Sequence, residues 1–184
     1  LVPNCEPARL PTPVLGANAN WVVETLAEIK NKHHITVQEW SVGGHSLGGH
    51  AAASMIDKIS DDVISKLVMW GVYSLPGLNL RNSTAQTLLV TATEDGFNWP
   101  SNGTQKEDLF QKLPSRVHSL DDSAASTTFW YEIKGGNHAG FANYGPQYFS
   151  KPDGNRTISL EEQHQQIVQV VSRFILGDQS IDSQ

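Results

Sequence analysis

The sequence is short of cysteine and of basic side chains, and each shortage excludes a class of protein. Cys5 is the single cysteine among 184 residues, so neither an internal disulfide nor a cysteine-based metal cluster can form. Lysine and arginine together number 13 against 19 aspartate and glutamate residues, which gives a net charge of -6 at pH 7. An acidic chain with no basic run is poorly suited to an anionic partner. We therefore expect neither a nucleic acid nor an anionic membrane surface as a partner.

Long apolar runs are also missing from the sequence. No stretch approaches the roughly 20 apolar residues that a helix needs to span a bilayer, so we expect no membrane span. The first residues, Leu1, Val2 and Pro3, do not resemble a secretory signal peptide, which has a charged region followed by a long apolar one. Because the sequence does not start with Met and a proline-rich lead precedes the first expected helix, we expect a further N-terminal part upstream of residue 1.

The rest of the composition is typical of one globular domain. Hydrophobic residues make up 39% and charged residues 17% of the chain, and a chain of this length can bury a single core. We expect one domain over residues 1–184, with an irregular, proline-rich lead over residues 1–16. Three glycosylation sequons lie in expected loops and are compatible with secretion. They begin at Asn82, Asn102 and Asn155.

Strands and helices are expected to alternate along the chain. Short apolar runs between polar turns predict strands over residues 36–42, 64–70, 87–93 and 127–134. Apolar residues at helical spacing predict helices over residues 18–32, 47–59, 104–113 and 159–177. The last helix should begin with a capping box of Ser159 and Glu162 and end at Gly177. This order predicts the α/β fold class, with a mostly parallel sheet that carries helices on both faces.

Residues 44–48 have the sequence Gly-His-Ser-Leu-Gly, in which the pattern G-x-S-x-G places a serine on a sharp turn between a strand and a helix. The bare pattern arises by chance in roughly one chain in ten of this length, but here an expected strand precedes it and a helix rich in small residues follows. Such a turn strains the serine backbone, and glycines at 44 and 48 avoid side chains that would collide. The sequence therefore predicts Ser46 as a nucleophile at a helix N-terminus, against the alternative of a glycine-rich turn with an incidental serine.

A serine hydroxyl needs a base at neutral pH, and histidine is the usual one. Of the seven histidines, His138 lies just past the expected strand 127–134, in a loop with glycines on both sides. Such a loop can bend over the edge of the sheet and carry the imidazole towards the serine. His45 directly precedes Ser46, so its side chain should point away from the hydroxyl. The others are expected to be surface or packing residues: His33, His34, His50, His118 and His164.

The acid of such a site accepts the second imidazole N–H, and it follows a strand between the serine and the histidine in the sequence. The loop after the expected strand 87–93 contains two adjacent carboxylates, Glu94 and Asp95. Both are separated from Ser46 and from His138 by enough residues for a helix and a strand. Both Asp95 and Glu94 remain candidates for the acid at this point, because a pattern does not settle a shift of one residue within a loop; the preference for Asp95 comes from the family resemblance described next.

These segments together resemble the alpha/beta-hydrolase superfamily, in particular its small lidless dienelactone-hydrolase-like esterases. The resemblance depends on residues 43–52, 95–96, 135–141 and 144–147, and it covers about residues 21–176. It implies a triad of Ser46, Asp95 and His138. It also implies an oxyanion hole made by the backbone N–H of Leu47 and a second N–H from a loop after an earlier strand. The first strands of the usual sheet and that loop have no counterpart before Asn20, so the resemblance implies an N-terminally truncated alpha/beta-hydrolase fold.

The predicted function is hydrolysis of small-molecule carboxylic esters through an acyl-enzyme on Ser46, without a metal ion or an organic cofactor. Losing one oxyanion donor typically costs about 100-fold to 1,000-fold in rate. The alternative is therefore a weakly active or inactive hydrolase-fold chain that binds a small molecule or a partner. Three aromatic residues in loops are candidates either for an acyl pocket or for packing: Trp99, Phe141 and Tyr144.

Overall fold

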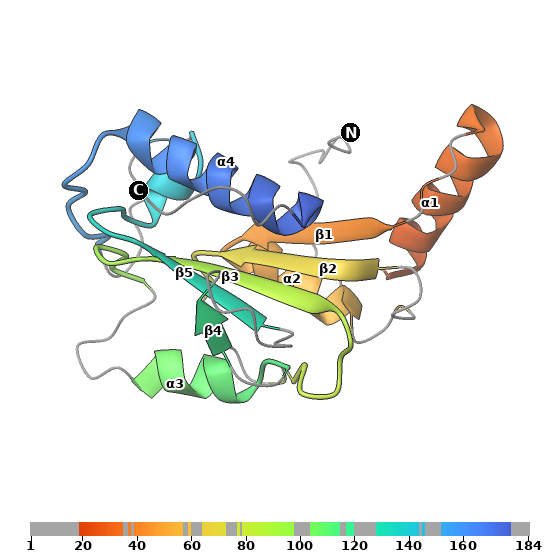
Figure 1. Cartoon of the computed structure of the whole chain (residues 1–184), viewed down its shortest axis with the longest axis horizontal. Coiled ribbons are helices and arrows are strands. Elements are labelled where there is room, and N and C mark those ends of the chain that lie inside the picture. Colours follow the sequence, from red (N-terminus) through yellow and green to blue (C-terminus); the bar gives the residue numbers. More distant parts are fainter. Residues whose placement is uncertain are drawn as a thin grey trace.

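The computed structural model describes the chain in segments separated by gaps. These are residues 19–34, 37, 39–56, 59, 64–72, 77, 79–97, 104–114, 117–119, 128–143, 145 and 152–177. The irregular lead that we expected over residues 1–16 lies outside the described residues. Figure 1 shows a twisted sheet with helices on both of its faces, so the predicted α/β fold class is confirmed.

A five-stranded sheet forms the centre of the molecule. Its strands are β1 (Trp40–His45), β2 (Ile64–Trp70), β3 (Gln86–Ala92), β4 (Val117–Ser119) and β5 (Thr128–Ile133). The strand order is β1-β2-β3-β5-β4, and every neighbouring pair runs parallel. The predicted parallel sheet is confirmed, and it contains one short strand, β4, that the sequence analysis did not predict. All five strands therefore end at the same edge of the sheet, which is where open parallel sheets bind their ligands.

Four α-helices accompany the sheet in the part of the chain that is described. They are α1 (Ala19–His33), α2 (Leu47–Ile56), α3 (Thr104–Gln111) and α4 (Leu160–Leu176). In Figure 1, α4 lies along one face of the sheet, α2 and α3 lie on the other, and α1 stands apart beyond the start of β1. Both faces of the central strands are thus covered by helices, as the order of elements predicts.

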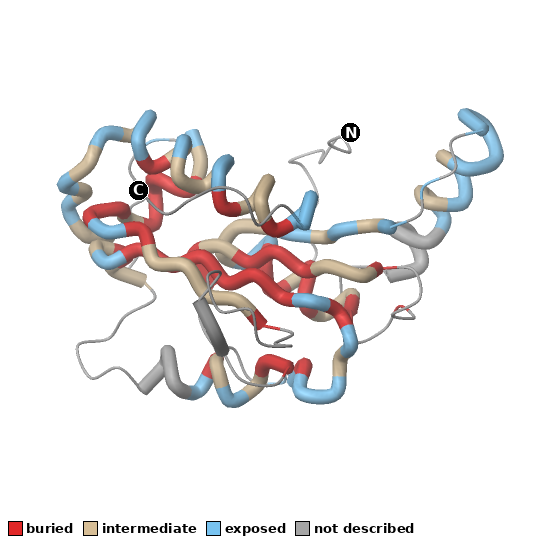
Figure 2. The backbone as a smooth tube through the Cα atoms, in the orientation of Figure 1, coloured by how far each residue is buried: buried red, intermediate tan, exposed pale blue. Residues whose placement is uncertain are grey.

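Two apolar layers hold these helices against the sheet. The layer towards α2 and α3 includes Leu67, Met69, Leu89, Ala53 and Leu109. The layer towards α4 includes Val68, Leu88, Val90, Val170 and Phe174. Because successive residues of a strand point to opposite faces, β2 and β3 must be apolar at consecutive positions to fill both layers. Figure 2 shows the result as a buried band that runs through the middle of the sheet.

Helix α4 begins and ends where the sequence predicts. The Ser159 hydroxyl accepts a hydrogen bond of 3.0 Å from the N–H of Glu162, which satisfies one of the N–H groups left free in a first helical turn. At the other end, Gly177 has a φ of 66° and its N–H donates to the Arg173 carbonyl. Glycine adopts this left-handed conformation without a steric penalty. The caps therefore fix the length of α4 against the sheet.

Two of the three sequons lie within the described residues. Asn82 is in a turn, Asn155 is in an irregular segment, and both are exposed, as a glycan acceptor must be. Asn102 lies outside the described residues. Among the helices that the structure describes, none combines the length and the apolar character needed to cross a membrane.

Removing the Phe174 ring should destabilise the protein, because this ring fills the layer between α4 and the sheet. Phe174 is 5% exposed, and its ring meets that of Phe129 edge-on with 5.7 Å between the centroids. We expect Phe174→Ala to lower the free energy of unfolding by about 3–5 kcal/mol, measured by urea denaturation. Val168→Ala on the same helix is the matched control, since Val168 is 64% exposed. Its effect should stay below about 0.5 kcal/mol, and equal losses for the two variants would contradict the placement of α4.

Candidate active site

Ser46 is the single residue between β1 and α2, as the G-x-S-x-G pattern predicts. Its φ of 53° lies in the left-handed region, which costs a residue with a side chain and persists only where the surroundings enforce it. The enforcing contacts are hydrogen bonds of the Ser46 backbone. Its N–H donates to the Trp70 carbonyl at 3.0 Å, and its carbonyl accepts from Gly49 N–H and His50 N–H at 3.0 and 3.2 Å. The strained turn is therefore held by the neighbouring strand β2 on one side and by the first turn of α2 on the other.

The glycines around this turn have different roles from those that we expected. A Cβ at Gly44 would lie 2.5 Å from the carbonyl oxygen of Gly48, so the collision argument holds for Gly44. For Gly48 it is wrong, because a Cβ there would meet nothing within 4 Å; this position faces outward from the first turn of α2. Gly49 is the second glycine that the packing requires, since its Cβ would collide with the Val72 side chain and lie 2.7 Å from the Gly44 carbonyl oxygen.

Asp95 and His138 meet in a buried hydrogen bond. Asp95 follows β3, His138 follows β5, and the distance from His138 Nδ1 to Asp95 Oδ2 is 2.8 Å. The His138 side chain is 3% exposed and the Asp95 side chain 0%, so water does not compete for this bond. The second carboxylate oxygen, Asp95 Oδ1, accepts the N–H of Phe97 at 2.9 Å. Because a carboxylate only accepts, Nδ1 of His138 carries the proton, and Nε2 is the ring nitrogen left for other chemistry.

The structure separates the two competing carboxylates. Asp95 is 2% exposed and contacts the His138 ring, whereas the Glu94 carboxylate accepts the Thr93 hydroxyl at 3.1 Å on the exposed side of the loop. The two residues belong to a turn that the Asp95 N–H closes with a hydrogen bond of 3.2 Å to the Ala92 carbonyl, and their side chains leave this turn in different directions. Within the described residues, Asp95 is thus the carboxylate that the fold brings to the histidine.

The loops that carry Asp95 and His138 are joined to each other where they leave the sheet. Thr93 N–H donates to the Ile133 carbonyl at 3.1 Å, and Glu94 N–H donates to the Gly136 carbonyl at 2.9 Å. In the other direction, Gly135 N–H donates to the Thr93 hydroxyl at 2.8 Å. These bonds extend the parallel pairing of β3 and β5 past the ends of the strands, and they bring the two loops side by side.

His45 is a residue of the site to which the sequence analysis gave no role. Its ring lies against the His138 ring with 4.4 Å between the centroids, and 5.5 Å from the centroid of Phe141. Burial lowers the pKa of His45 from 6.5 to about 3; the nearby His138 acts in the same direction, and Asp153 partly opposes it. His45 is therefore neutral at neutral pH. The signal available in the sequence was its position at the end of the nucleophile strand, next to Ser46.

The structure links Ser46 to the Asp95–His138 pair indirectly: His45, the residue before Ser46 in the chain, packs on the His138 ring. Among the described residues, no hydrogen bond joins the Ser46 hydroxyl to His138. Catalytic hydrogen bonds are often long without substrate and tighten when it binds.

Leu47, the predicted oxyanion donor, is the first residue of α2 and is 41% exposed. Its N–H belongs to the first turn, where helical N–H groups lack partners within the helix.

A buried glutamine on α4 holds the histidine loop, and the sequence analysis missed it. Gln163 is fully buried, its Nε2 donates to the Asn137 carbonyl at 2.9 Å, and its Oε1 accepts the Asn137 N–H at 3.2 Å. A Cβ at Gly140 would collide with this side chain, so the glycine lets the loop pass over it. Gln163 continues the apolar stripe of Ile167, Val170 and Phe174 towards the start of α4, and a polar residue in such a stripe was the available signal.

Of the three aromatic candidates for an acyl pocket, the structure describes Phe141 alone. Phe141 is 5% exposed and belongs to the apolar layer under α4, so it packs. Trp99 and Tyr144 lie outside the described residues. In those residues, no three histidine, cysteine, aspartate or glutamate side chains form a group that could hold a metal ion.

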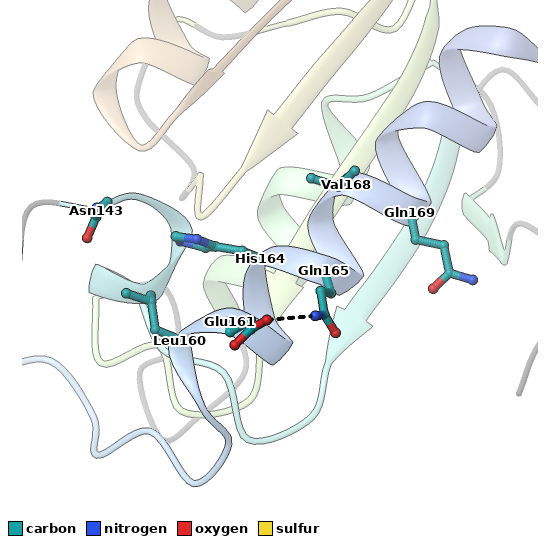
Figure 3. Close-up of a pocket in the computed structure, with 7 residues that line it drawn as sticks. All are labelled: Asn143, Leu160, Glu161, His164, Gln165, Val168 and Gln169. Atoms are coloured by element: carbon teal, nitrogen blue, oxygen red, sulfur yellow. Dashed lines mark hydrogen bonds between the residues drawn. The ribbon is translucent and has the colours of Figure 1, made fainter.

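A separate pocket of about 640 Å³ lies on the outer side of α4 (Figure 3). Asn143 lies at one end, and Glu161, His164 and Val168 of α4 form much of the wall. None of Ser46, Asp95 and His138 lines this pocket. It is therefore not part of the candidate active site.

Comparisons with known proteins agree with this fold. Residues 15–165 match the model of a family described as the alpha/beta hydrolase family. No curated protein matches the chain. Among solved structures, a similar one is a protein of unknown function from Agrobacterium tumefaciens, whose assignment as an alpha/beta hydrolase is provisional. The TM-score is 0.54 at 12% sequence identity, and the match covers 87% of this chain and 61% of that one.

The structural likeness, at that identity, shows a shared fold, and this chain spans about three fifths of the length of that neighbour. The match to the family model is a likeness in sequence, and residues 15–165 include the turn at Ser46 and both of the loops that carry Asp95 and His138. A match over most of the sequence shows that this chain belongs to the alpha/beta hydrolase family.

Proposed function

We propose that this protein is a serine hydrolase that cleaves carboxylic esters of small molecules, with one catalytic domain over residues 1–184. The observation that carries the proposal is the buried bond of 2.8 Å between His138 Nδ1 and Asp95 Oδ2. The strained backbone of Ser46 at the start of α2 supports it. An oriented histidine near a serine at a helix N-terminus is the arrangement that activates a hydroxyl for attack.

The proposed reaction has two halves that use the same groups. In the first, His138 Nε2 takes the Ser46 proton while the serine oxygen bonds to the ester carbonyl carbon. His138 then gives this proton to the alcohol that leaves, and the acyl group stays on Ser46. In the second half, His138 takes a proton from water, and the oxygen of that water attacks the acyl carbon. The proton returns to Ser46 as the carboxylic acid is released, so no metal ion or organic cofactor is required.

Charge stabilisation comes from two sides in this proposal. Asp95 accepts the Nδ1–H bond and stabilises the imidazolium that His138 becomes. The Leu47 N–H, at the positive end of the α2 dipole, donates to the carbonyl oxygen as it gains negative charge. His45 is neutral, and this favours the imidazolium of His138. The centroids of the two rings lie 4.4 Å apart, so a charged His45 would repel the positive charge on His138.

A non-catalytic family member that binds a small molecule or a partner is the second candidate. The observation in its favour is that, among the described residues, the Ser46 hydroxyl makes no hydrogen bond to His138. If a second oxyanion donor is lacking, the rate falls by about 100-fold to 1,000-fold. A fluorophosphonate probe distinguishes the candidates, because it labels an activated serine and leaves an unactivated one unmodified.

Replacing the proposed nucleophile should abolish turnover without unfolding the protein. We expect Ser46→Ala to lower kcat/KM for a short activated ester by about 10,000-fold or more, and to prevent fluorophosphonate labelling. The matched control is Ser41→Ala, because Ser41 is an exposed serine on the same strand β1 and should leave both readings unchanged. Unchanged turnover in Ser46→Ala would rule out the mechanism.

Replacing each carboxylate of the acid loop by its amide should separate Asp95 from Glu94. Asp95→Asn keeps the shape of the side chain but no longer fixes the histidine tautomer, so kcat should fall by about 10,000-fold. Glu94→Gln should retain kcat within about threefold, because Glu94 contacts the Thr93 hydroxyl and not His138. Steady-state kinetics on the two variants provide the measurement, and a larger loss in Glu94→Gln would reverse the assignment.

The pH dependence of stability should report the half-buried, neutral state of His45. Its pKa is about 3 in the folded protein against an ordinary 6.5, so between these values the unfolded state binds more protons than the folded state. This contribution is therefore fully present above pH 6.5 and is lost as the pH falls towards 3. We expect His45→Gln to show a smaller loss of unfolding free energy than the unmodified protein between pH 7 and pH 4.5, measured in urea. His33→Gln, which removes an exposed histidine of α1, is the control, and equal flattening in both variants would contradict this account.

A further inference from the structure

We propose that Asp153 is a positioning residue for the acid–base pair, because its carboxylate ties the loop that carries Asp95 to the loop that carries His138. The inference rests on the proposed function, since it assigns to Asp153 the geometry on which that chemistry depends. Asp153 lies in the irregular segment before α4, 57 residues past Gly96 and 15 residues past His138 in the sequence. The Asp153 carboxylate bonds to backbone N–H groups, and not to the His138 imidazole or the Asp95 carboxylate.

Four backbone N–H groups converge on the Asp153 carboxylate. Oδ1 accepts from Gly96 at 3.1 Å, from His138 at 3.1 Å and from Gly154 at 2.9 Å. Oδ2 accepts from Ala139 at 2.8 Å. Gly96 directly follows the acid, and the His138 N–H belongs to the base itself, so one carboxylate fixes the backbone beside each of the paired side chains.

The segment around Asp153 also packs directly against the acid loop. A Cβ at Gly96 would lie 2.5 Å from the Pro152 carbonyl oxygen, and a Cβ at Gly154 would collide with the Glu94 carbonyl oxygen. Both positions therefore require glycine, because backbone meets backbone there with no room for a side chain. This close approach brings the Asp153 carboxylate within reach of the N–H groups of both loops.

The same segment is anchored to the histidine loop at two further points. Asn137 Nδ2 donates to the Gly154 carbonyl at 2.8 Å, and Thr157 N–H donates to the Gly135 carbonyl at 2.8 Å. Asn137 Oδ1 in turn accepts the Gly140 N–H at 3.0 Å. The part of the segment that follows Asp153 is thus bonded to the histidine loop at two points.

Apart from the Asp95–His138 bond itself, the bonds that join the two loops directly end before the reactive residues. They involve Thr93 and Glu94 on one side and residues 133–136 on the other, whereas Asp153 acts at Gly96 and at His138–Ala139. Without Asp153, the backbone next to each reactive side chain would lose its bridging contact. A displacement of about 1 Å in a catalytic group costs about 100-fold in rate, so this contact should matter for turnover more than for substrate binding.

The position calls for a carboxylate and not for its amide. Four donors need an acceptor that presents lone pairs on both sides, and an ionised aspartate does so without carrying a proton. An asparagine could keep one oxygen towards Gly96 and His138, but its NH₂ group would then face the Ala139 N–H, donor against donor. Asp153→Asn should therefore weaken the bridge in part, and Asp153→Ala should remove it.

The test measures kcat and KM for a short activated ester together with a proton NMR signal of the unmodified protein and its variants. We expect Asp153→Ala to lower kcat by about 100-fold and Asp153→Asn by about 10-fold, with KM within about twofold in both. The downfield signal of the His138 Nδ1–H should broaden in both variants, and its loss in Asp95→Asn assigns it. Asp108→Asn is the matched acid-to-amide control, because Asp108 pairs with Lys112 on the exposed side of α3 and should change neither reading.

Several outcomes would overturn the proposal. Folded Asp153→Asn and Asp153→Ala variants with the kcat and the NMR signal of the unmodified protein would show that the bridge does not position the pair. An unfolded Asp153→Asn variant would also count against it, because the carboxylate would then serve the fold as a whole. If Ser46→Ala retains turnover, the proposed function fails instead, and the NMR signal still tests separately whether Asp153 positions His138.

Discussion

A hydrogen bond of 2.8 Å between His138 Nδ1 and Asp95 Oδ2 sets the conditions that the rest of the structure must meet. A carboxylate without exposure to water is costly unless its oxygens are bonded. Asp95 meets this condition with the imidazole on one oxygen and the Phe97 N–H on the other. The backbone that carries each partner must then be fixed as well, because a small displacement would leave a buried charge without its partner. Gln163 and Asp153 supply those constraints from segments outside both loops.

The parallel sheet makes that bond possible. Because β3 and β5 are neighbours with Ala92 opposite Ile133, their following loops leave the sheet side by side at the same edge. Strand β1, which leads to Ser46, is connected to them through β2: Ser46 N–H donates to the Trp70 carbonyl, and Gly71 N–H donates to the Val90 carbonyl. Three turns that follow three different strands are thus linked through backbone hydrogen bonds before any side chain is considered. These backbone hydrogen bonds therefore determine where the side chains of the proposed triad lie.

Much of the fold follows from patterns that are local in the sequence. Apolar runs on β2 and β3, the glycine-flanked turn at Ser46 and the cap of α4 each depend on residues close to one another in the chain. Periodicity, turn preference and capping describe such segments well. The same kind of reasoning placed Asp95 and His138 after strands, and therefore at the correct edge of the sheet. It did not distinguish Asp95 from Glu94, because the direction of a side chain within a loop depends on what packs against that loop.

The sequence by itself therefore determined the α/β class, the strained serine turn and a short list of candidate residues. Only the tertiary structure decided which of them meet: Asp95 against His138, His45 on the His138 ring, and the Asp153 carboxylate on the N–H groups of two loops. It also showed that the position with no room for a side chain is Gly49, which lies against Val72, and not Gly48. The physical reason is that each of these contacts joins segments far apart in the chain or depends on the facing of one helical turn. Their geometry is set by strand pairing and helix packing, and local sequence patterns carry no record of it.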